Sequence, residues 1–198
     1  MFYVSIPVSY LCLKAIFTCM TIAIDNNLEL QLTNQLQAEA LFFAIAGNRG
    51  HLSAFLPWVS QMQTISDFRN YISSSEVLIA EGKEVSFAIS YDQEVVGRIG
   101  LHHINMMNKN GSIGYWLTKG AEGKGIITKC CKALISYGFN ELQLQRIEIK
   151  AAVHNVRSQA IPLKLNFTRE GVLRQAELVD NEFLDLVLYS LLRSEWKG

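Results

Sequence analysis

The sequence predicts an α/β fold of the mixed α+β kind, in which a twisted central sheet of about seven strands is flanked by helices. Segments with a period of two alternate along the chain with segments of helical period. The 198 residues suit one ordinary domain, and a hydrophobic fraction of 49% is sufficient for a packed interior. The expected order is a strand, helices, three strands, a helix, a strand, a helix and a final hairpin.

The first strand and the first helix follow each other closely. Leucines alternate with polar residues over 28–32, which indicates a half-buried strand. A helix is predicted over 34–48, with Thr33 as its N-terminal cap. Its apolar stripe is expected to consist of Leu36, Ala40, Phe43 and Ala44.

Two further helices are predicted before the sheet resumes. The segment 51–58, HLSAFLPW, extends a short second helix that Pro57 should end. Ser66 is the expected cap of a third helix that runs to about residue 82. The apolar stripe of this helix should contain Phe68, Tyr71, Ile72, Leu78 and Ile79.

From residue 85 the hydrophobic period changes to two, which predicts a meander of three strands. These strands are expected at 85–91, 95–102 and 112–117. The remaining elements are a helix over 123–139, a strand over 146–153, a helix over 155–165 and a hairpin of strands 167–177 and 183–192. Strand, glycine-rich loop and helix therefore follow one another at residues 112–139.

Residues 1–19 form an apolar leader that Pro7 and Lys14 interrupt. The leader lacks a basic start and a small-residue cleavage site, so it does not match a signal peptide. It is also too short for a membrane-spanning helix, which needs about 20 apolar residues. We expect the leader to be disordered or to precede a natural start at Met20, and we assign residues 20–198 to the folded domain without a membrane partner.

The charge balance and the cysteines narrow the class of protein. There are 18 basic and 18 acidic residues, so no net charge attracts nucleic acid. Four cysteines form no C-x-x-C pair, which argues against a zinc site or a disulfide framework and favours a cytoplasmic protein: Cys12, Cys19, Cys130 and Cys131. His102 and His103 are adjacent on a predicted strand and should face opposite sides, so we expect no shared metal.

The loop Gly123-Lys124-Gly125 stands where a strand passes into a helix. Unpaired N–H groups and the positive end of the helix dipole suit a phosphate or pyrophosphate there. A Walker loop is excluded because no Lys-Ser or Lys-Thr pair has the required offset. A dinucleotide-binding loop is disfavoured because Thr128 occupies the position of its third glycine. A turn that only begins a helix remains an alternative.

A second group of polar residues, Asn155 to Ser158, opens the next helix. Strand ends and helix starts from two adjacent units thus converge on one side of the sheet. Considered alone, Asn155 is a helix cap and Ser158 is a solvated helix residue.

Six blocks in order resemble the GNAT superfamily, specifically its RimJ/RimL branch of ribosomal-protein N-terminal acetyltransferases. The resemblance covers residues 26–195. The blocks are IGYWL at 113–117, EGKGIITKC at 122–130, HNVRS at 154–158, KLNF at 164–167, EGVLRQAE at 170–177 and VLYSLL at 187–192.

The resemblance implies that the strands at 113–117 and 147–153 splay apart and hold the pantetheine arm of acetyl-CoA between them. It implies that Asn155 binds the pantetheine and that Ser158 lies near the sulfur. The backbone amides expected around the pyrophosphate are those of Gly123, Lys124, Gly125, Ile127 and Thr128.

Catalytic roles also follow from the resemblance. Glu177 matches a position proposed for a general base, and Ser158 is the expected proton donor to the thiolate. A backbone N–H near Trp116 or Leu117 would polarise the carbonyl. Glu177 read alone is equally a solvent-facing strand residue. The residues matching the acceptor wall, and therefore expected to contact the substrate, are His51, Leu52 and Trp58.

Four residues depart from the family pattern. Glu122 places a carboxylate beside the pyrophosphate, so its side chain should point away or pair with Lys124. Ser112 replaces a frequent Glu, which leaves Glu177 as the candidate base. Asn166 replaces a glycine and tolerates the same left-handed conformation. Pro162 cannot donate to the carbonyl of Ser158 and should bend the helix there.

The sequence therefore predicts an N-acetyltransferase that moves acetyl from acetyl-CoA directly to a primary amine. The expected acceptor is the N-terminal α-amino group of a protein such as a ribosomal protein. A small amine, namely a polyamine, amino sugar or antibiotic, is one alternative, and a non-catalytic acyl-CoA-binding module is another. No metal or nucleic acid is expected, and a homodimer remains open.

Overall fold

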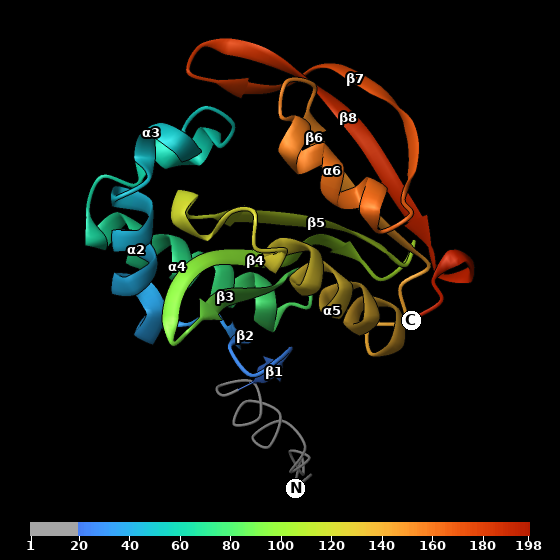
Figure 1. The fold of residues 1–198 in the computed structure, drawn as a ribbon, viewed down its shortest axis with the longest axis horizontal. Helices are drawn as coiled ribbons and strands as arrows, with labels where there is room; N and C mark the ends of the chain where they lie inside the picture. Colours follow the sequence, from blue (N-terminus) through green and yellow to red (C-terminus); the bar gives the residue numbers. More distant parts are fainter. Residues whose placement is uncertain (1–19) are drawn as a thin grey trace, which may run out of the picture.

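The computed structural model describes residues 20–198, in which a single eight-stranded sheet has the order β1-β2-β3-β4-β5-β6-β8-β7 (Figure 1). All neighbours are antiparallel except β5 and β6, which are parallel. The strands are β1 Thr21–Ala23, β2 Leu28–Leu32, β3 Val85–Tyr91, β4 Glu94–Asn105, β5 Asn110–Leu117, β6 Arg146–Ala152, β7 Thr168–Val179 and β8 Glu182–Leu192. The mixed α/β class is confirmed. The predicted leader 1–19 lies outside the described residues.

The described sheet has one strand more than the pattern indicated. Strand β1 is three residues long and pairs with β2 from Thr21↔Gln31 to Ala23↔Glu29. A segment this short shows too few alternations to be recognised from hydrophobicity. Its pairing with β2 is what makes it a strand.

Helices cover both faces of the sheet. Figure 1 shows α5 crossing in front of the strands and α4 behind them. The helices are α2 Ala38–Ala46, α3 Arg49–Leu52, α4 Ile65–Ala80, α5 Ile126–Asn140 and α6 Val156–Lys164, and the 3-10 turns are η1 Gln35–Gln37, η2 Pro57–Gln61, η3 Lys119–Ala121 and η4 Arg193–Glu195.

The two helical layers produce two hydrophobic cores. Residues of α5, such as Leu134 and Phe139, pack against one face of the sheet. Residues of α2 and α4, such as Leu41 and Phe68, pack on the other face with Trp116. Strand β3 is buried on both faces over most of its length. The middle of the sheet is therefore enclosed, while the β7–β8 hairpin at its end carries many exposed side chains.

Both predicted caps were displaced by one or two positions. Asn34, not Thr33, caps the turn η1, because its Oδ1 accepts from the Leu36 N–H at 2.8 Å. Thr64, not Ser66, caps α4, and it exchanges hydrogen bonds with Asp67 in a capping box. Local sequence offers several cap residues here, and the backbone angles decide which one is used.

Pro57 does not end a helix as predicted. Helix α3 ends at Leu52, and Pro57 opens the separate turn η2. A proline fits the first position of a helical turn because its missing N–H would be unpaired there anyway.

The apolar stripe predicted for α2 was wrong. Leu36 is 91% exposed and Phe43 is 62% exposed, whereas Ala38, Leu41 and Ile45 are fully buried. The sequence of α2, AEALFFAIA, carries apolar residues at helical spacing on more than one side. Packing against α4 and the sheet decides which side is buried. Leu78, assigned to the stripe of α4, is also exposed.

The cysteines of α5 and the paired histidines were also singled out from the sequence. Cys130 and Cys131 are buried free thiols. A bulge in β4 and a φ of 53° at His103 interrupt the alternation that would place the two histidines on opposite faces. His102 and His103 both line the same hollows, but residues 20–198 contain no group of three potential metal ligands. No helix in this range is long and apolar enough to cross a membrane.

Candidate active site

Strands β5 and β6 separate in the middle of the sheet. Their parallel pairing runs from Asn110↔Arg146 to Ile113↔Ile149 and ends there. Beyond this point β5 continues along β4 to Leu117, and β6 continues along β8 to Ala152. The facing edges of these two segments do not pair with each other, so their backbone groups are available to an extended ligand.

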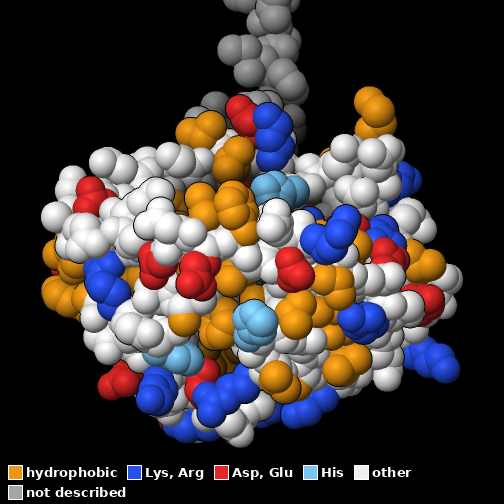
Figure 2. Space-filling model, turned by 90° about the horizontal axis from the view of Figure 1, so that it is seen from above, with side chains coloured by type: hydrophobic (Ala, Val, Ile, Leu, Met, Phe, Trp, Pro, Cys, Tyr) orange, Lys and Arg blue, Asp and Glu red, His pale blue; other side chains and the backbone are white. Residues whose placement is uncertain are grey.

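A hollow of about 410 Å³ opens at this separation. On one side it is lined by β5, β6 and the start of α6, and on the other by β4, β7 and the segment before and within η2. We call the part next to α6 the cofactor side and the part next to β7 and η2 the acceptor side. Viewed from the end bearing the β7–β8 hairpin, hydrophobic side chains gather across the surface, and charges of both signs lie among and around them (Figure 2).

The loop before α5 has the conformation that an anion site requires. Gly123 and Gly125 have φ values of 77° and 75°, in the left-handed region that favours glycine. Gly125 is the N-cap of α5, so no cap side chain bonds to the first N–H groups of the helix, and the first turn contains no acidic residue. Gly123, Lys124 and Gly125 are exposed, whereas Ile127 is buried and Thr128 is half-buried. The Gly123–Gly125 loop is therefore accessible to a phosphate group.

Glu122 pairs with two residues, and neither is Lys124. Its Oε2 lies 2.5 Å from Arg157 Nη1 at the start of α6, and its Oε1 lies 3.1 Å from His51 Nε2 in α3. Lys124 instead lies over the ring of Tyr91, with Nζ 5.0 Å from the ring centroid. The carboxylate is thus turned towards α3 and α6, and a nearby cation partly neutralises its charge.

Replacing Glu122 with Gln is expected to tighten coenzyme A binding about two- to fivefold, because a partly exposed charge interaction contributes up to about 1 kcal/mol. The change removes a negative charge beside the Gly123–Gly125 loop and releases Arg157. Titration calorimetry with coenzyme A at low and high salt measures the effect, which salt should reduce. Glu141→Gln, at the opposite end of α5, is the matched control. Unchanged or weaker binding by Glu122→Gln would contradict the expectation.

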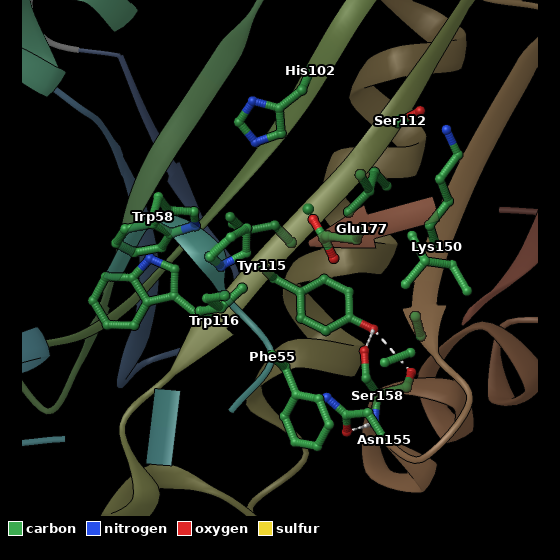
Figure 3. Close-up of a pocket in the computed structure, with 18 of the residues that line it drawn as sticks. Phe55, Trp58, His102, Ser112, Tyr115, Trp116, Lys150, Asn155, Ser158 and Glu177 are labelled. Carbon is green, nitrogen blue, oxygen red and sulfur yellow. Dashed lines mark hydrogen bonds between the residues drawn. The ribbon is translucent and has the colours of Figure 1, made fainter. Parts of the chain in front are cut away.

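The start of α6 holds Asn155 and Ser158 at the hollow. Asn155 is the helix cap, since its Oδ1 accepts from the Ser158 N–H at 3.0 Å. The side-chain amide nitrogen of Asn155 is the group left to bind a ligand. Ser158 lies beside Tyr115 of β5, whose hydroxyl is 3.1 Å from Ser158 Oγ (Figure 3).

Tyr115 supplies the hydrogen-bond donor that Pro162 cannot provide to the Ser158 carbonyl. The ring of Pro162 removes the N–H that would bond to the carbonyl of Ser158, and the Tyr115 hydroxyl donates to that carbonyl at 3.0 Å. Helix α6 continues through Pro162 to Lys164. Burial raises the pKa of Tyr115, so its hydroxyl stays protonated and remains a donor. No local sequence pattern indicates this contact, because its partners are 43 positions apart.

A double-mutant cycle tests whether the Tyr115 hydroxyl takes the place of the N–H that Pro162 lacks. Tyr115→Phe should lower the free energy of unfolding by about 1–2 kcal/mol, since it leaves the Ser158 carbonyl without its donor. Pro162→Ala restores a backbone N–H four residues after Ser158, so the same Tyr115→Phe change should cost less in that background. Urea unfolding of the four proteins measures the coupling. Strictly additive effects would show that the two residues act independently.

Glu177 enters the hollow from β7 because of a bulge. The β7–β8 register shifts between Leu173 and Glu177, and Gln175 within it has a φ of 49°. Such bulges re-aim side chains, and Glu177 becomes half-buried on the acceptor side. Burial raises the pKa of this carboxyl, and the Lys150 charge partly opposes the shift. A carboxylate with a raised pKa is a stronger base than an exposed one.

The three residues predicted to contact the acceptor lie in different places. Trp58 lines the hollow, stacks on Tyr71 with ring centroids 6.0 Å apart, and lies near Trp116. His51 pairs with Glu122, next to the Gly123–Gly125 loop. Leu52 is buried in the core of α2 and α4. Of the three, the hollow brings only Trp58 together with Glu177.

A buried polar network beneath the acceptor side was missed from the sequence. Arg98 donates to Glu84 at 2.9 Å and to Ser86 at 2.7 Å, and it also bonds to Tyr71. His102 Nδ1 lies 3.2 Å from the other oxygen of Glu84. Burial alone would raise the pKa of Glu84, but the hydrogen bond from His102 and the charges of His102 and Arg98 outweigh it and lower the pKa to about 2. Glu84 is therefore an ionised, buried carboxylate.

Comparison with known proteins agrees with this geometry. Residues 27–168 match the family model described as the acetyltransferase (GNAT) domain. YdaF of Bacillus subtilis (strain 168), named a putative ribosomal N-acetyltransferase, is 36% identical over 92% of this chain and 98% of its own length. The ribosomal-protein-serine acetyltransferase of Escherichia coli (strain K12) is 32% identical over 86% of this chain and 95% of its own.

A solved structure extends the similarity to three dimensions. RimL, an α-N-protein acetyltransferase of a ribosomal protein, was solved in complex with coenzyme A. It superposes with a TM-score of 0.84 at 26% identity, covering 87% of this chain and 98% of that one. The similarity thus includes a relative that holds coenzyme A.

Proposed function

This chain belongs to the GNAT acetyltransferase family, and from that premise we propose that it transfers the acetyl group of acetyl-CoA to the N-terminal α-amino group of a protein, with a ribosomal protein as the expected acceptor. The residues that line the hollow support a single terminal amine as the acceptor. Glu177 is its only carboxylate within the described residues, and it lies with Lys150 and Arg98 rather than with further acids. A polyamine presents several positive charges and would meet too few carboxylates there, whereas one terminal amine needs only one.

The cofactor side supports the binding of acetyl-CoA. The pyrophosphate would lie against the N–H groups of the exposed Gly123–Gly125 loop and of the first turn of α5, including Ile127 and Thr128. The pantetheine arm would run between β5 and β6, along the backbone of Trp116 and Leu117 and towards the Asn155 amide. Relatives that bind coenzyme A have the same fold, which supports this placement.

Acetyl transfer requires three chemical roles from the residues of this chain. The neutral amine nitrogen attacks the thioester carbon, and Glu177 takes the proton that this nitrogen loses as the C–N bond forms. A backbone N–H near Trp116 or Leu117 stabilises the oxyanion that forms. As the new C–N bond is completed, the C–S bond breaks and Ser158 supplies a proton to the thiolate, with Tyr115 holding the serine in place. Ser158 then regains a proton from solvent, to which Glu177 releases its own. No covalent enzyme intermediate is needed, because the thioester is already activated.

The location proposed for the protein is the cytoplasm. Ribosomal proteins are synthesised there, and the free thiols of Cys130 and Cys131 are compatible with a reducing compartment. We also propose that no nucleic acid contacts the chain directly.

Mass spectrometry tests the acceptor. The purified protein is incubated with acetyl-CoA and a panel of peptides carrying ribosomal-protein N-termini, with spermidine and amino sugars in parallel. We expect one acetyl group on the peptide α-amine and none on the same peptides with a formylated N-terminus. Acetylation of only the small amines would replace the proposal with the small-molecule alternative. Coenzyme A binding without any turnover would favour a non-catalytic acyl-CoA-binding module.

A further inference from the structure

His102 is held in one orientation by a buried carboxylate. Its Nδ1 lies 3.2 Å from Glu84 Oε2, and Glu84 is 8% exposed and fixed from its other side by Arg98. An ionised carboxylate can only accept, so the imidazole must donate its Nδ1 proton to it. The neutral imidazole then carries its lone pair on Nε2.

The Nε2 atom of His102 lies against two glycines in neighbouring strands. Gly100 of β4 pairs with Gly114 of β5. A Cβ atom added at Gly100 would lie 2.9 Å from His102 Nε2, and one added at Gly114 would lie 3.3 Å from Cδ2 and 3.5 Å from Nε2 of the same ring. The missing side chains therefore make room for the imidazole, and Gly114 is the residue directly after the point where β5 leaves β6. Nε2 thus lies at the apex of the opening between the strands.

His102 also borders a second hollow. This hollow, of about 600 Å³, is lined by the end of α4, the residues before β3 and the end of β4, including Lys83 and Glu84. His102 lines both this second hollow and the first one, between β5 and β6, and its side chain is 26% exposed. Figure 3 shows the His102 ring projecting from β4 at the end of the pocket away from Tyr115 and Ser158. His102 therefore borders a hollow through which a proton can reach solvent without crossing the cofactor side.

The nitrogen of a protonated amine loses two protons during the reaction, one more than a single carboxylate accepts at a time. A protonated amine carries three N–H protons and the amide product carries one, so two protons must leave the nitrogen. One is balanced by the proton that the sulfur gains, and the other must reach solvent. Glu177 is positioned for one transfer, which leaves a requirement for a second acceptor.

We propose that His102, oriented by Glu84, is the second proton acceptor of the site and removes the first proton from the ammonium form of the acceptor. The proton passes from nitrogen to Nε2 and then to water in the second hollow, which returns the imidazole to its neutral form. Glu84 acts as a positioning residue. The charged and titratable groups that line the two hollows with His102, or bond to it, are Tyr71 of α4, Glu81, Lys83 and Glu84 between α4 and β3, Arg98 and His103 of β4, Tyr115 of β5, Lys150 of β6 and Glu177 of β7. The inference rests on the proposed acetyl transfer to an amine, but not on which amine is acetylated.

The pH dependence of a His102→Gln variant tests this role. At pH 6.5 most of an α-amine with a pKa of about 7.7–8.0 is protonated, so kcat/KM should fall about 10- to 100-fold relative to the wild type. At pH 9 the amine is already neutral, and the deficit should shrink to within about twofold. His103→Gln, the neighbouring histidine, is the matched control and should retain the wild-type profile. A deficit that is equal at both pH values, or no deficit at all, overturns the proposal.

A second measurement does not depend on turnover. Nitrogen-15 NMR of the histidine ring, assigned with His102→Gln, should show the Nδ1-protonated neutral tautomer in the wild type and a loss of that preference in Glu84→Gln. A neutral ring protonated on Nε2 in the wild type would refute the proposal. If the wild type acetylates only small amines, the proposal of a protein N-terminus as acceptor is wrong. The pH test of His102 can then be run with those small amines. If it acetylates nothing, the proposed function fails and the tautomer alone decides the role of His102.

Discussion

Replacing Glu177 with Gln is expected to lower kcat/KM for acetyl transfer by about 100-fold or more, within the range of about 10²–10⁴ that general bases contribute. The carboxylate is half-buried in the hollow, and the β7 bulge directs it there. Steady-state kinetics with a peptide acceptor measure the loss, and the KM for acetyl-CoA should stay near the wild-type value. Glu182→Gln, an exposed residue on the neighbouring β8, is the matched control. Wild-type activity in Glu177→Gln would remove Glu177 from the mechanism.

The same variant should be at least as stable as the wild type at neutral pH. Burial raises the pKa of Glu177 in the folded protein above its unfolded value. A carboxyl of this kind favours folding while it is protonated, and that contribution is lost as the pH rises through its folded pKa. Gln cannot ionise, so it avoids the loss. Equal or higher stability in urea at pH 7 would separate a catalytic effect from unfolding.

Replacing Arg98 with Leu is expected to destabilise the protein by about 3–5 kcal/mol, because it leaves Glu84 as a buried charge without its main cation. Arg98 and Glu84 are 5% and 8% exposed and join α4, β3 and β4 through shared hydrogen bonds. Urea unfolding at pH 7 measures the change. Arg69→Leu removes an exposed pair with Glu39 at 2.8 Å and should cost less than about 1 kcal/mol.

The pH dependence of unfolding gives a second signature of this network. The pKa of Glu84 is lowered from 4.5 to about 2, so its contribution to stability is present above pH 4.5 and is lost as the pH falls towards 2. Without Arg98 the shift should be smaller, and the variant should lose less stability than the wild type over that range. Parallel curves for the two proteins would contradict a coupling between Arg98 and Glu84.

The sequence predicted the order of elements and the loop before α5 well, because both depend on local rules. Alternating hydrophobicity marks the strands, and an exposed loop with positive φ needs glycine at residues 123 and 125. Asn155 was correctly identified as a possible cap, since cap preference is a property of the residue and its neighbours. Asn166 likewise adopts a φ of 61°, as its tolerance of the left-handed region predicts.

Local sequence patterns did not predict the structure correctly where two or more arrangements were locally equivalent. The helix α2 offered more than one apolar stripe, and packing with α4 buries Leu41 and Ile45 while leaving Phe43 exposed. Glu122 was expected to point away or to pair with Lys124, but its partners His51 and Arg157 lie on elements distant in the sequence. The spacing of residues along the chain does not indicate which residues distant in the sequence will be neighbours in the fold.

By itself, the sequence determined the fold class, the family and the strand-loop-helix junction that suits a pyrophosphate, because hydrophobic period, glycine conformation and cap chemistry act over a few residues. Only the tertiary structure determined which side chains of the site contact one another. Tyr115 reaches the carbonyl that Pro162 leaves unpaired, and Glu84 fixes His102 beside Gly114. Each of these contacts depends on the register of adjacent strands or on helix packing, so it exists only once the whole sheet has formed.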